Sequence, residues 1–394
     1  MPAVLTSAQL ARDLAITDLS DPAEGAAGPP HAIQMVAELA VSALTSAWGC
    51  AARWCRGPRI VTIADNYDRL GYLASAVTRE ARYTRYVDDR RVLRSHSTAM
   101  VPPALRLLAE EPDPPDDVLL VCPGIVYRRD AIDWQHSPAP HQLDLWRVSR
   151  KPLGEADMNE MITALLGALA PGRESLQHRR DHPYTTSGRQ VDVAHAGGWV
   201  EVWECGLADQ RVLAGAGLAD RSGLALGMGL DRLLMLLKGI PDIRLLRSAD
   251  ARVAGQMLDL APFRPVSAMP AVRRDLSVAV DAETDDEILG DRIRDALGPD
   301  ADAVEAVAIL SATAQEDLPG PAAARLGARP GQRNLLVRVV LRHLERTLTD
   351  EEANSLRDRI YAAVHQGTRH QWAAAQRPRA GWIARPAGGA ELRP

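Results

Sequence analysis

The sequence predicts an α+β protein with a larger N-terminal part and a smaller C-terminal domain. Segments that alternate apolar and polar residues, as strands do, cluster at 121–148 and 191–205. Segments with helical periodicity flank them, at 31–49 and 154–172. A proline-rich linker, 261–272, then separates a second group of strand and helix signals from the first.

Length and composition indicate a globular protein of two or three domains. The 394 residues are 46% hydrophobic, and the net charge of -5 gives no whole-chain case for binding nucleic acid. No apolar run approaches the roughly 20 residues of a membrane span, and Met1 is not followed by a signal-peptide pattern. Cys50, Cys55, Cys122 and Cys205 lack paired CxxC spacing, which predicts buried free thiols and no zinc site. We therefore expect a cytoplasmic protein with no membrane partner.

The chain begins with a leader and a long helix. Residues 1–30 contain a short possible helix and then SDPAEGAAGPP, which predicts a flexible leader. From His31, HAIQMVAELAVSALTSAWG places apolar residues at helical spacing and ends at Gly49. A short strand, the polar turn SHST and a helix that begins near Pro102-Pro103 are expected farther along.

The stretch 121–148 predicts an antiparallel hairpin with an unusually polar inner face. LLVC leads through Pro123-Gly124 into VYRRD, and HQLDLW returns with alternating character. Its polar residues are Arg128, Arg129, Asp130, Asp133, His136, His141, Gln142 and Asp144. A solvated face is the simpler interpretation, but unpaired charges are costly between flanks that look buried, which favours a binding site.

Further elements follow the hairpin. The segment 154–172 predicts a helix, and VDV and WVEVWEC predict strands on either side of Gly197-Gly198. GLALGMGLDRLLMLLKG then reads as a glycine-rich strand end that enters an apolar helix carrying Arg232. Glycine allows a ligand or another strand to approach the backbone closely.

The C-terminal part reads as strand, helix, strand, strand, helix and short final strand, which is the order of a ferredoxin-like βαββαβ unit over 273–372. Thr349 and Glu352 predict a capping box on its last helix, and 373–394 predicts a disordered tail. Residues 264–324 hold 5 arginines against 13 acidic residues, whereas 325–394 hold 13 against 6. The basic last 70 residues are therefore a candidate polyanion-binding surface.

The polar stretches suit polyphosphate chemistry. Arg128 and Arg232 lie beside glycines, and guanidinium groups bind phosphate oxygens in two-point geometry. Asp130, Asp144 and Glu201 could bind an ammonium group or hold Mg²⁺ against phosphates. The chain has no GxxxxGK[ST] loop and no GxGxxG after a strand, so P-loop and Rossmann sites lose their main signals. A carboxylate attack on the α-phosphate of ATP needs mainly alignment and charge neutralisation.

These residues carry a family resemblance. VYRRDAID..H....HQLDL resembles motif 2, and GLALGMGLDRLLMLLKGIPDIRLL resembles motif 3, of the class II phenylalanyl-tRNA synthetase catalytic (alpha-type) subunit. LRSHST is similar to the family's substrate loop, and HAIQ with its helix takes the place of motif 1. MPAVRRDLSVAV and TLTDEE resemble the ferredoxin-fold anticodon-binding domain. The resemblance runs from His31 to about Trp372 and implies a class II antiparallel sheet with flanking helices at 31–260.

The resemblance also implies roles. Arg128 would contact the ATP α-phosphate and Arg232 the γ-phosphate end, as the catalytic pair, and Glu201 would bind Mg²⁺. The implied ATP and Mg²⁺ site comprises Arg128, Asp130, Glu201 and Arg232. The implied amino-acid site comprises His96, Thr98, Gln142, Asp144, His182, Tyr184 and Ala225. The activity implied is ATP-dependent activation of phenylalanine or a related aromatic or polar-aromatic amino acid, followed by transfer to tRNA.

The chain departs from the family pattern at several positions. His182-Pro183-Tyr184 replaces an aromatic Phe-Pro-Phe pair, and Pro140 replaces the aromatic residue that packs on adenine. Glu204 falls where the family usually has glycine, and Asp144 is a shorter version of its glutamate. Two alternatives follow: a divergent paralogue that activates a non-protein amino acid in specialised biosynthesis, or a non-catalytic regulator that binds tRNA or an amino acid. The expected partner is tRNA, bound by the C-terminal domain of a monomer or homodimer without a separate β subunit.

Overall fold

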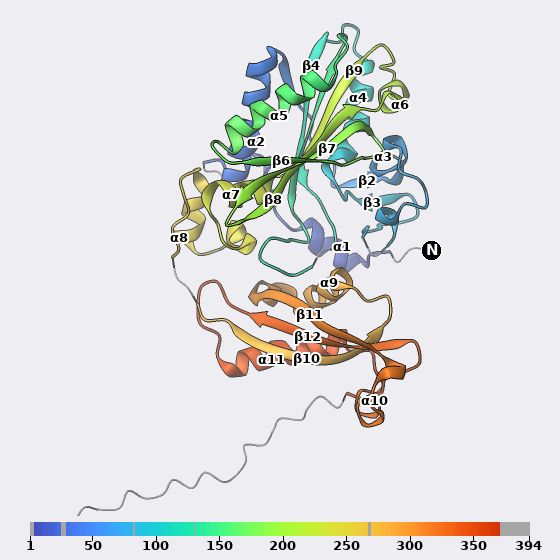
Figure 1. The fold of residues 1–394 in the computed structure, drawn as a ribbon, viewed down its shortest axis with the longest axis vertical. Coiled ribbons are helices and arrows are strands. Elements are labelled where there is room, and N and C mark those ends of the chain that lie inside the picture. The colour runs from blue at the N-terminus through green and yellow to red at the C-terminus, as the bar shows by residue number, and fades with distance from the viewer. Residues whose placement is uncertain (1–3, 25–28, 82, 130, 267–268, 371–394) are drawn as a thin grey trace, which may run out of the picture.

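The computed structural model describes residues 4–24, 29–81, 83–129, 131–266 and 269–370. Figure 1 shows a large N-terminal unit built around one sheet and a smaller C-terminal unit packed against one end of it. The predicted disordered tail, 373–394, lies outside the described residues. Within the described part of the chain, no helix has the length and apolar character needed to cross a bilayer.

A seven-stranded sheet forms the centre of the large unit and confirms the predicted α+β class. Its strands, in spatial order, are β1 (Ala51–Trp54), β4 (Asp117–Ile125), β5 (His141–Ser149), β9 (Ser222–Gly229), β8 (Gly198–Ala208), β7 (Thr185–His195) and β6 (Ser175–Arg179). Every neighbouring pair is antiparallel except β1 and β4. The predicted hairpin at 121–148 is confirmed as β4 and β5, with Val121 opposite Leu145 and Ile125 opposite His141.

The two faces of the sheet have different partners, because side chains alternate along each strand. One face packs against α2 (Ala32–Trp48), α5 (Glu155–Leu169) and α7 (Leu230–Lys238), through residues such as Leu143 and Leu145. The other face carries Trp146 and Ala225 toward α4 (Val101–Ala109) and α6 (Gln210–Gly215). The predicted helices at 31–49 and 154–172 are thus confirmed as α2 and α5. The second face continues past these side chains into a pocket.

The N-terminal segment differs from the predicted flexible leader. Residues Ser7–Leu14 form helix α1, capped by Thr6 in a capping box with Gln9. Asp18 and Ser20 beyond the helix are buried against the large unit. The leader prediction is therefore wrong for this segment, since buried polar groups with partners outweigh its disorder-like composition. A small outer layer follows, with β2 (Ile60–Thr62) paired to β3 (Arg91–Leu93) and the short helix α3 (Ile63–Asn66) between them.

The C-terminal unit has a three-stranded antiparallel sheet in the order β10 (Val272–Asp281), β12 (Gln332–Leu341), β11 (Val304–Ala314). Helices α9 (Asp286–Leu297) and α11 (Asp350–Val364) contribute to one core with the sheet, and the capping box of Thr349 and Glu352 is confirmed. An extra helix, α10 (Gly320–Leu326), was not predicted. The described residues after α11 form no strand, although Gln366 donates from its backbone N–H to Ala279 O at the β10 edge (2.7 Å).

The two units share buried contacts. The backbone N–H of Val307 in β11 donates to Ile132 O (2.8 Å), and the Ile132 side chain is buried within the C-terminal core. Buried Arg85 of the large unit lies 2.7 Å from Asp291 of α9. Arg294 donates to Ala131 O (2.7 Å). The loop between β4 and β5 is therefore held on one side by the C-terminal unit.

Candidate functional site

A pocket of about 530 Å³ opens over β5, β9 and β8 on the sheet face that carries Trp146. The strand register places its polar floor. Asp144 of β5 and Glu204 of β8 both lie opposite Gly227 of β9, so the two carboxylates flank a glycine in one row. Gln142 lies opposite Gly229 in the adjacent row. The two glycines leave room above the middle strand, because neither adds a side chain between its neighbours.

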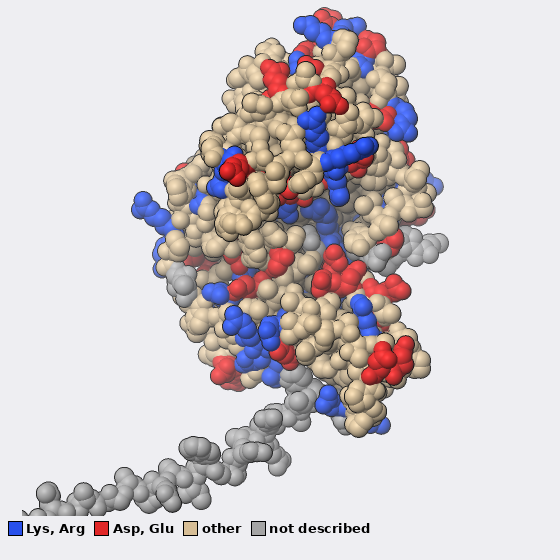
Figure 2. Space-filling model, viewed as in Figure 1, with Lys and Arg blue, Asp and Glu red and all other residues tan. Residues whose placement is uncertain are grey.

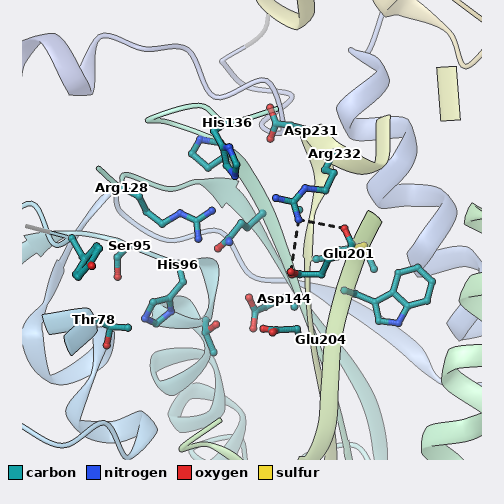
Figure 3. A pocket seen from close by; sticks show the side chains of 18 of the residues that line it. Thr78, Ser95, His96, Arg128, His136, Asp144, Glu201, Glu204, Asp231 and Arg232 are labelled. Carbon is teal, nitrogen blue, oxygen red and sulfur yellow. Dashed lines mark hydrogen bonds and ion pairs between the residues drawn. The ribbon is translucent and has the colours of Figure 1, made fainter. Parts of the chain in front are cut away.

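One end of the pocket is cationic. Arg128 follows β4 and is exposed to the pocket, while Arg232 enters from the first turn of α7. Figure 3 shows the two guanidinium groups pointing into the same space from different sides. Arg232 Nη1 lies 3.9 Å from a carboxylate oxygen of Glu201, and among the described residues no carboxylate pairs with Arg128. Two guanidinium forks facing one cleft can bind two separate phosphate groups.

The hollow and its rim differ in charge. Figure 2 shows blue side chains within the hollow of the large unit and red side chains below it, where the C-terminal unit begins. Glu287 of α9 lines the pocket, and Arg129 lies 3.5 Å from Asp291 of the same helix. The C-terminal unit thus forms one wall at the cationic end.

Asp144 is the most deeply buried acid of the pocket. It accepts hydrogen bonds from Ser97 Oγ (2.5 Å) and from Trp146 Nε1 (3.4 Å). Burial raises the pKa of the Asp144 carboxyl to about 6, because desolvation disfavours the ionised form. Gln142 Oε1 accepts from the backbone N–H of Ser97 (3.1 Å). A substrate ammonium group placed between these oxygens would compensate the buried charge.

Aromatic rings form the other end of the pocket. Tyr72 lies 5.9 Å from the His96 ring and 6.2 Å from Tyr184, measured between ring centroids. His182 stacks on Tyr184 at 5.2 Å with the planes 15° apart. Burial lowers the pKa of His96 to about 4, so this ring is neutral at physiological pH. These rings suit a substrate with a flat side chain.

Glu204 links the polar floor to the rings. One carboxylate oxygen accepts from Arg180 Nε (3.0 Å), and the other lies 2.7 Å from His182 Nε2. Burial acts to raise the pKa of Glu204, but the hydrogen bond and charge of His182, with those of Arg180, give a net lowering. Glu204 is therefore an ionised group of fixed orientation inside the pocket.

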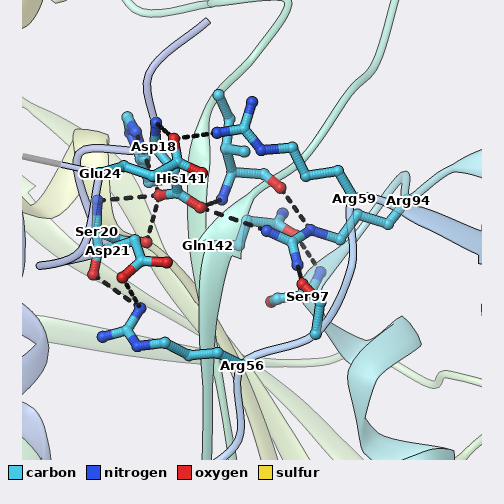
Figure 4. Close-up of polar contacts among 12 residues, drawn as sticks. Asp18, Ser20, Asp21, Glu24, Arg56, Arg59, Arg94, Ser97, His141 and Gln142 are labelled. Carbon is cyan, nitrogen blue, oxygen red and sulfur yellow. Dashed lines mark hydrogen bonds and ion pairs between the residues drawn. The ribbon is translucent and has the colours of Figure 1, made fainter. Parts of the chain in front are cut away.

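A polar network behind the pocket joins the two arginine-bearing segments. The backbone N–H of His141 donates to Asp231, and His141 Nδ1 lies 3.0 Å from the same carboxylate. The other ring nitrogen, Nε2, accepts from the backbone N–H of Leu19 (3.1 Å). Asp18 accepts from the backbone N–H of Ile125 (2.8 Å), and Figure 4 shows Asp18 beside His141 with Arg59 and Arg94 converging on this region. The N-terminal segment therefore fixes the base of the β4–β5 hairpin.

The structure brings together most residues predicted for the site. The pocket is lined by Arg128, Arg232, Glu201, His96, Thr98, Gln142, Asp144, His182 and Tyr184, and also by Pro140. Ala225 is buried between Trp146 and Gly206 of the neighbouring strands, behind the pocket lining. Asp130 lies outside the described residues. The sequence interpretation missed Ser97, although it stands between two predicted residues, and Tyr72, which no motif marks.

The described side chains of the protein do not form a metal site on their own. Within the described ranges, no group of three or more His, Cys, Asp or Glu side chains is arranged for metal binding. All four cysteines are free thiols, with Cys122 and Cys205 buried and Cys50 and Cys55 half-buried. Glu201 presents one carboxylate beside Arg232. Such a single acid fits Mg²⁺ that is held mainly by nucleotide phosphates and water.

Comparisons with known proteins place the chain in a family. Residues 27–257 match the model of the tRNA synthetases class II core domain (F), which covers more than half of the chain. The phenylalanine–tRNA ligase alpha subunit of Prochlorococcus marinus (strain MIT 9313) is 34% identical over 243 residues, covering 61% of this chain and 69% of that protein. The chloroplastic/mitochondrial phenylalanine–tRNA ligase of Arabidopsis thaliana is 29% identical over 322 residues, covering 78% and 70%. The mitochondrial phenylalanine–tRNA ligase of Mus musculus is 29% identical over 351 residues, covering 78% and 72%.

The extent of these matches bears on the C-terminal unit. A match over 78% of this chain is longer than residues 1–257 together, so it continues beyond the core into the C-terminal part. The strand order and the pocket are consistent with this family match. The chain belongs to the class II aminoacyl-tRNA synthetases, with a catalytic core of the phenylalanyl-tRNA synthetase type.

Proposed function

We propose that this protein activates an aromatic amino acid with ATP and transfers the aminoacyl group to tRNA. The observation that carries the proposal is the placement of Arg128 and Arg232 on one pocket that also contains an acid-lined aromatic end. In the first step a carboxylate oxygen of the amino acid bonds to the α-phosphorus of ATP, and the bond to the β-phosphate oxygen breaks. The products are an aminoacyl adenylate and pyrophosphate.

Arg128 and Arg232 are proposed to act by charge stabilisation. Arg128 would bind the α-phosphate, where negative charge is redistributed as the new bond forms, and Arg232 would bind the departing pyrophosphate. The carboxylate of Glu201 would hold Mg²⁺, which supplies further charge neutralisation on the phosphates when it is bound. No side chain has to serve as a nucleophile, since the substrate carboxylate attacks directly.

Asp144 and Gln142 are proposed to hold the amino acid. Their oxygens meet beside Ser97 at the floor of the pocket, where an α-ammonium group can donate to both. The ionised form of Asp144 is required, so amino-acid binding should weaken as pH falls through about 6. Tyr72, Tyr184 and His96 would then contact the side chain.

We propose that tRNA is bound in part by the C-terminal unit. Many of its arginines already have acidic partners, such as Arg338 with Asp275 and Arg342 with Glu305. Arg325 and Arg329 are exposed, and they are better candidates for phosphate contacts. Changing both to glutamate should weaken tRNA binding about tenfold and leave amino-acid activation unchanged. Equal tRNA affinity of the variant and the parent across salt concentrations would remove this part of the proposal.

We also propose that the chain works without a separate β subunit. The support is that its matches to the plant and mouse enzymes, whose names mention no subunit, extend beyond the core. The apolar face of α2 packs into the core of its own unit. The two alternatives considered above, a specialised biosynthetic paralogue and a non-catalytic regulator, are not favoured, because the relatives are named as tRNA ligases.

The test is ATP–pyrophosphate exchange across a panel of amino acids. We expect exchange with at least one aromatic amino acid, and a loss of about a hundredfold or more in Arg128→Ala and in Arg232→Ala. Arg252→Ala is the matched control, because Arg252 is exposed and pairs with Asp250 outside the pocket. Absence of exchange with every amino acid would contradict the proposed activity, and equal loss in the control would contradict the assigned arginines.

A further inference from the structure

The floor of the pocket carries a second carboxylate, Glu204, beside the Asp144 that is assigned to the α-ammonium group. Asp144 and Glu204 lie in one row across β5, β9 and β8 and face the same space over Gly227. Asp144 and Gln142 already provide acceptors beside Ser97 for the α-ammonium group. Ionised acids at a binding site are favourable only when the ligand or the protein supplies donors for them. Glu204 has protein partners in Arg180 and His182, but the proposed function assigns it no contact with the substrate.

Glu204 is held in place and still has acceptor capacity. Arg180 and His182 each engage a different carboxylate oxygen, at 3.0 Å and 2.7 Å, and so fix the orientation of the group. A carboxylate has about four lone-pair positions, so these two contacts leave about half of them free. The side chain is 23% exposed, and it lines the pocket. A ligand donor can reach it without displacing either partner.

The surroundings of Glu204 define what the donor is attached to. His182, which holds Glu204, stacks on Tyr184, and Tyr184 lies beside Tyr72. The negative charges of Asp144 and Glu204 contribute to raising the pKa values of both tyrosines, after the larger effect of burial, so the acids and rings share one region. A plain benzyl side chain would cover the Glu204 carboxylate without supplying a hydrogen bond. A ring that carries a hydroxyl or amino group would supply one.

We propose that Glu204, oriented by His182, binds a hydrogen-bond donor on the substrate side chain, so that the site takes a hydroxyl- or amino-bearing aromatic amino acid in preference to phenylalanine. This inference rests on the proposed function for the orientation of the amino acid between Asp144 and the rings. Glu204 is then a specificity-determining residue, and Asp144 serves the α-ammonium group that all amino acids share. The two acids should respond differently to the chemistry of the side chain.

The experiment measures binding and activation separately. Binding of phenylalanine, tyrosine and 4-aminophenylalanine to the full chain is measured by calorimetry, and pyrophosphate exchange is measured with the same three compounds. Wild-type protein is compared with Glu204→Gln, Glu204→Gly and Asp144→Asn, each checked by thermal unfolding. The ratio of affinities for the three compounds can be measured on wild-type protein, whether or not the variants fold. Glu204→Gly provides a second test if Glu204→Gln does not fold.

We expect wild-type protein to prefer tyrosine or 4-aminophenylalanine to phenylalanine by about tenfold or more in affinity and in kcat/KM. Glu204→Gln and Glu204→Gly should reduce this preference to near unity, chiefly through weaker binding of the donor-bearing compounds. Asp144→Asn should weaken all three compounds alike and keep the ratio. This contrast separates side-chain recognition from general damage to the pocket.

Each other outcome is decisive. A wild-type preference for phenylalanine would overturn the inference and leave the proposed function standing. Equal losses of affinity for all three compounds in Glu204→Gln would also overturn it, because the carboxylate would then be binding the α-ammonium group. Selective binding of tyrosine through Glu204 without any exchange would support the inference and contradict the proposed activity. Absence of binding by all three compounds would overturn both.

Discussion

The imidazole of His141 and the carboxylate of Asp231 lie 3.0 Å apart in the interior, between the β4–β5 hairpin and helix α7. The same carboxylate accepts from the backbone N–H of His141. Gln142 follows His141 and Arg232 follows Asp231, so this contact fixes two pocket residues from opposite segments. Burial acts to raise the pKa of Asp231, but the charge and hydrogen bonds of His141 lower it overall.

Asp231→Asn should therefore destabilise the protein and reduce activity. The substitution removes a buried charge on which His141 and, through it, the N-terminal segment depend. We expect the free energy of unfolding to fall by about 3 kcal/mol at neutral pH, measured by urea denaturation. The lowered pKa means that this stabilisation is present above the ordinary value of 3.8 and is lost as pH falls below it. Asp220→Asn, at an exposed position, is the control, and an equal loss there would contradict the assignment.

Asp144→Asn should have the opposite effect on stability. The carboxyl pKa is raised from 3.8 to about 6, so the neutral form is favoured in the folded protein, and its stabilisation is lost as pH rises through about 6. Replacing the acid by a neutral amide should raise the free energy of unfolding at about pH 7.5 by as much as about 3 kcal/mol. The gain should disappear at about pH 4, and amino-acid binding should be weakened. A less stable variant at about pH 7.5 would contradict the prediction.

His96 should contribute to acid sensitivity. Its pKa is lowered from 6.5 to about 4 by burial, so the folded protein requires the neutral ring, and stability is lost as pH falls from about 6.5 toward about 4. Between about pH 7.5 and about pH 5, His96→Gln should lose about 2 kcal/mol less unfolding free energy than the parent. His178→Gln, on an exposed side chain, should follow the parent. Identical pH profiles for His96→Gln and the parent would show that this ring is not responsible.

Two contacts of α9 offer a matched test of docking between the units. Asp291→Ala removes a buried partner of Arg85, which should lower the free energy of unfolding by about 3 kcal/mol or more. Asp295→Ala removes the partner of Arg12, where both side chains are about a third exposed, and should cost less than about 1 kcal/mol. Calorimetric unfolding of both variants provides the comparison. Equal effects would mean that burial does not set the strength of these contacts.

Two glycines provide a second matched pair. A Cβ atom at Gly124 would lie 2.1 Å from Nη2 of Arg94, whose guanidinium group donates to Ile125 O and Gly57 O. Gly124→Ala should therefore lower the free energy of unfolding by about 2 kcal/mol, because the buried arginine has to move. Gly167 lies within α5 with open space around it, and Gly167→Ala should raise stability by about 0.5–1 kcal/mol. Chemical denaturation distinguishes the two signs.

The sequence predicted local structure more fully than it predicted contacts. Helix α2, helix α5 and the hairpin were recoverable, because periodicity, glycine stops and turn residues all act over short distances. Arg128 and Arg232 stood in recognisable patterns, so the sequence could assign both to one site. Their shared pocket depends on the packing of α7 beside β5, which no local signal records.

The remaining features depend on register and on distant partners. Glu204 and Asp144 became neighbours only through the alignment of three strands on Gly227. Ala225 lies on the pocket face of β9, but one row away from Gly227, beside Trp146. Asp18 belongs to a stretch with the composition of a mobile segment, and its order comes from Ile125 and Arg94. Such contacts join residues far apart in the chain, so composition and periodicity cannot indicate them.

The position of Ile132 has a consequence for how the protein unfolds. This residue belongs by sequence to the hairpin loop of the large unit, yet its side chain completes the core of the C-terminal unit. Without the large unit, the C-terminal core would have an apolar hole where Ile132 packs. Without the C-terminal unit, the Ile132 side chain of the large unit would be exposed. We therefore expect the two units to lose their structure in one cooperative transition, so that the linker at 261–272 marks a boundary in the sequence but not one in folding.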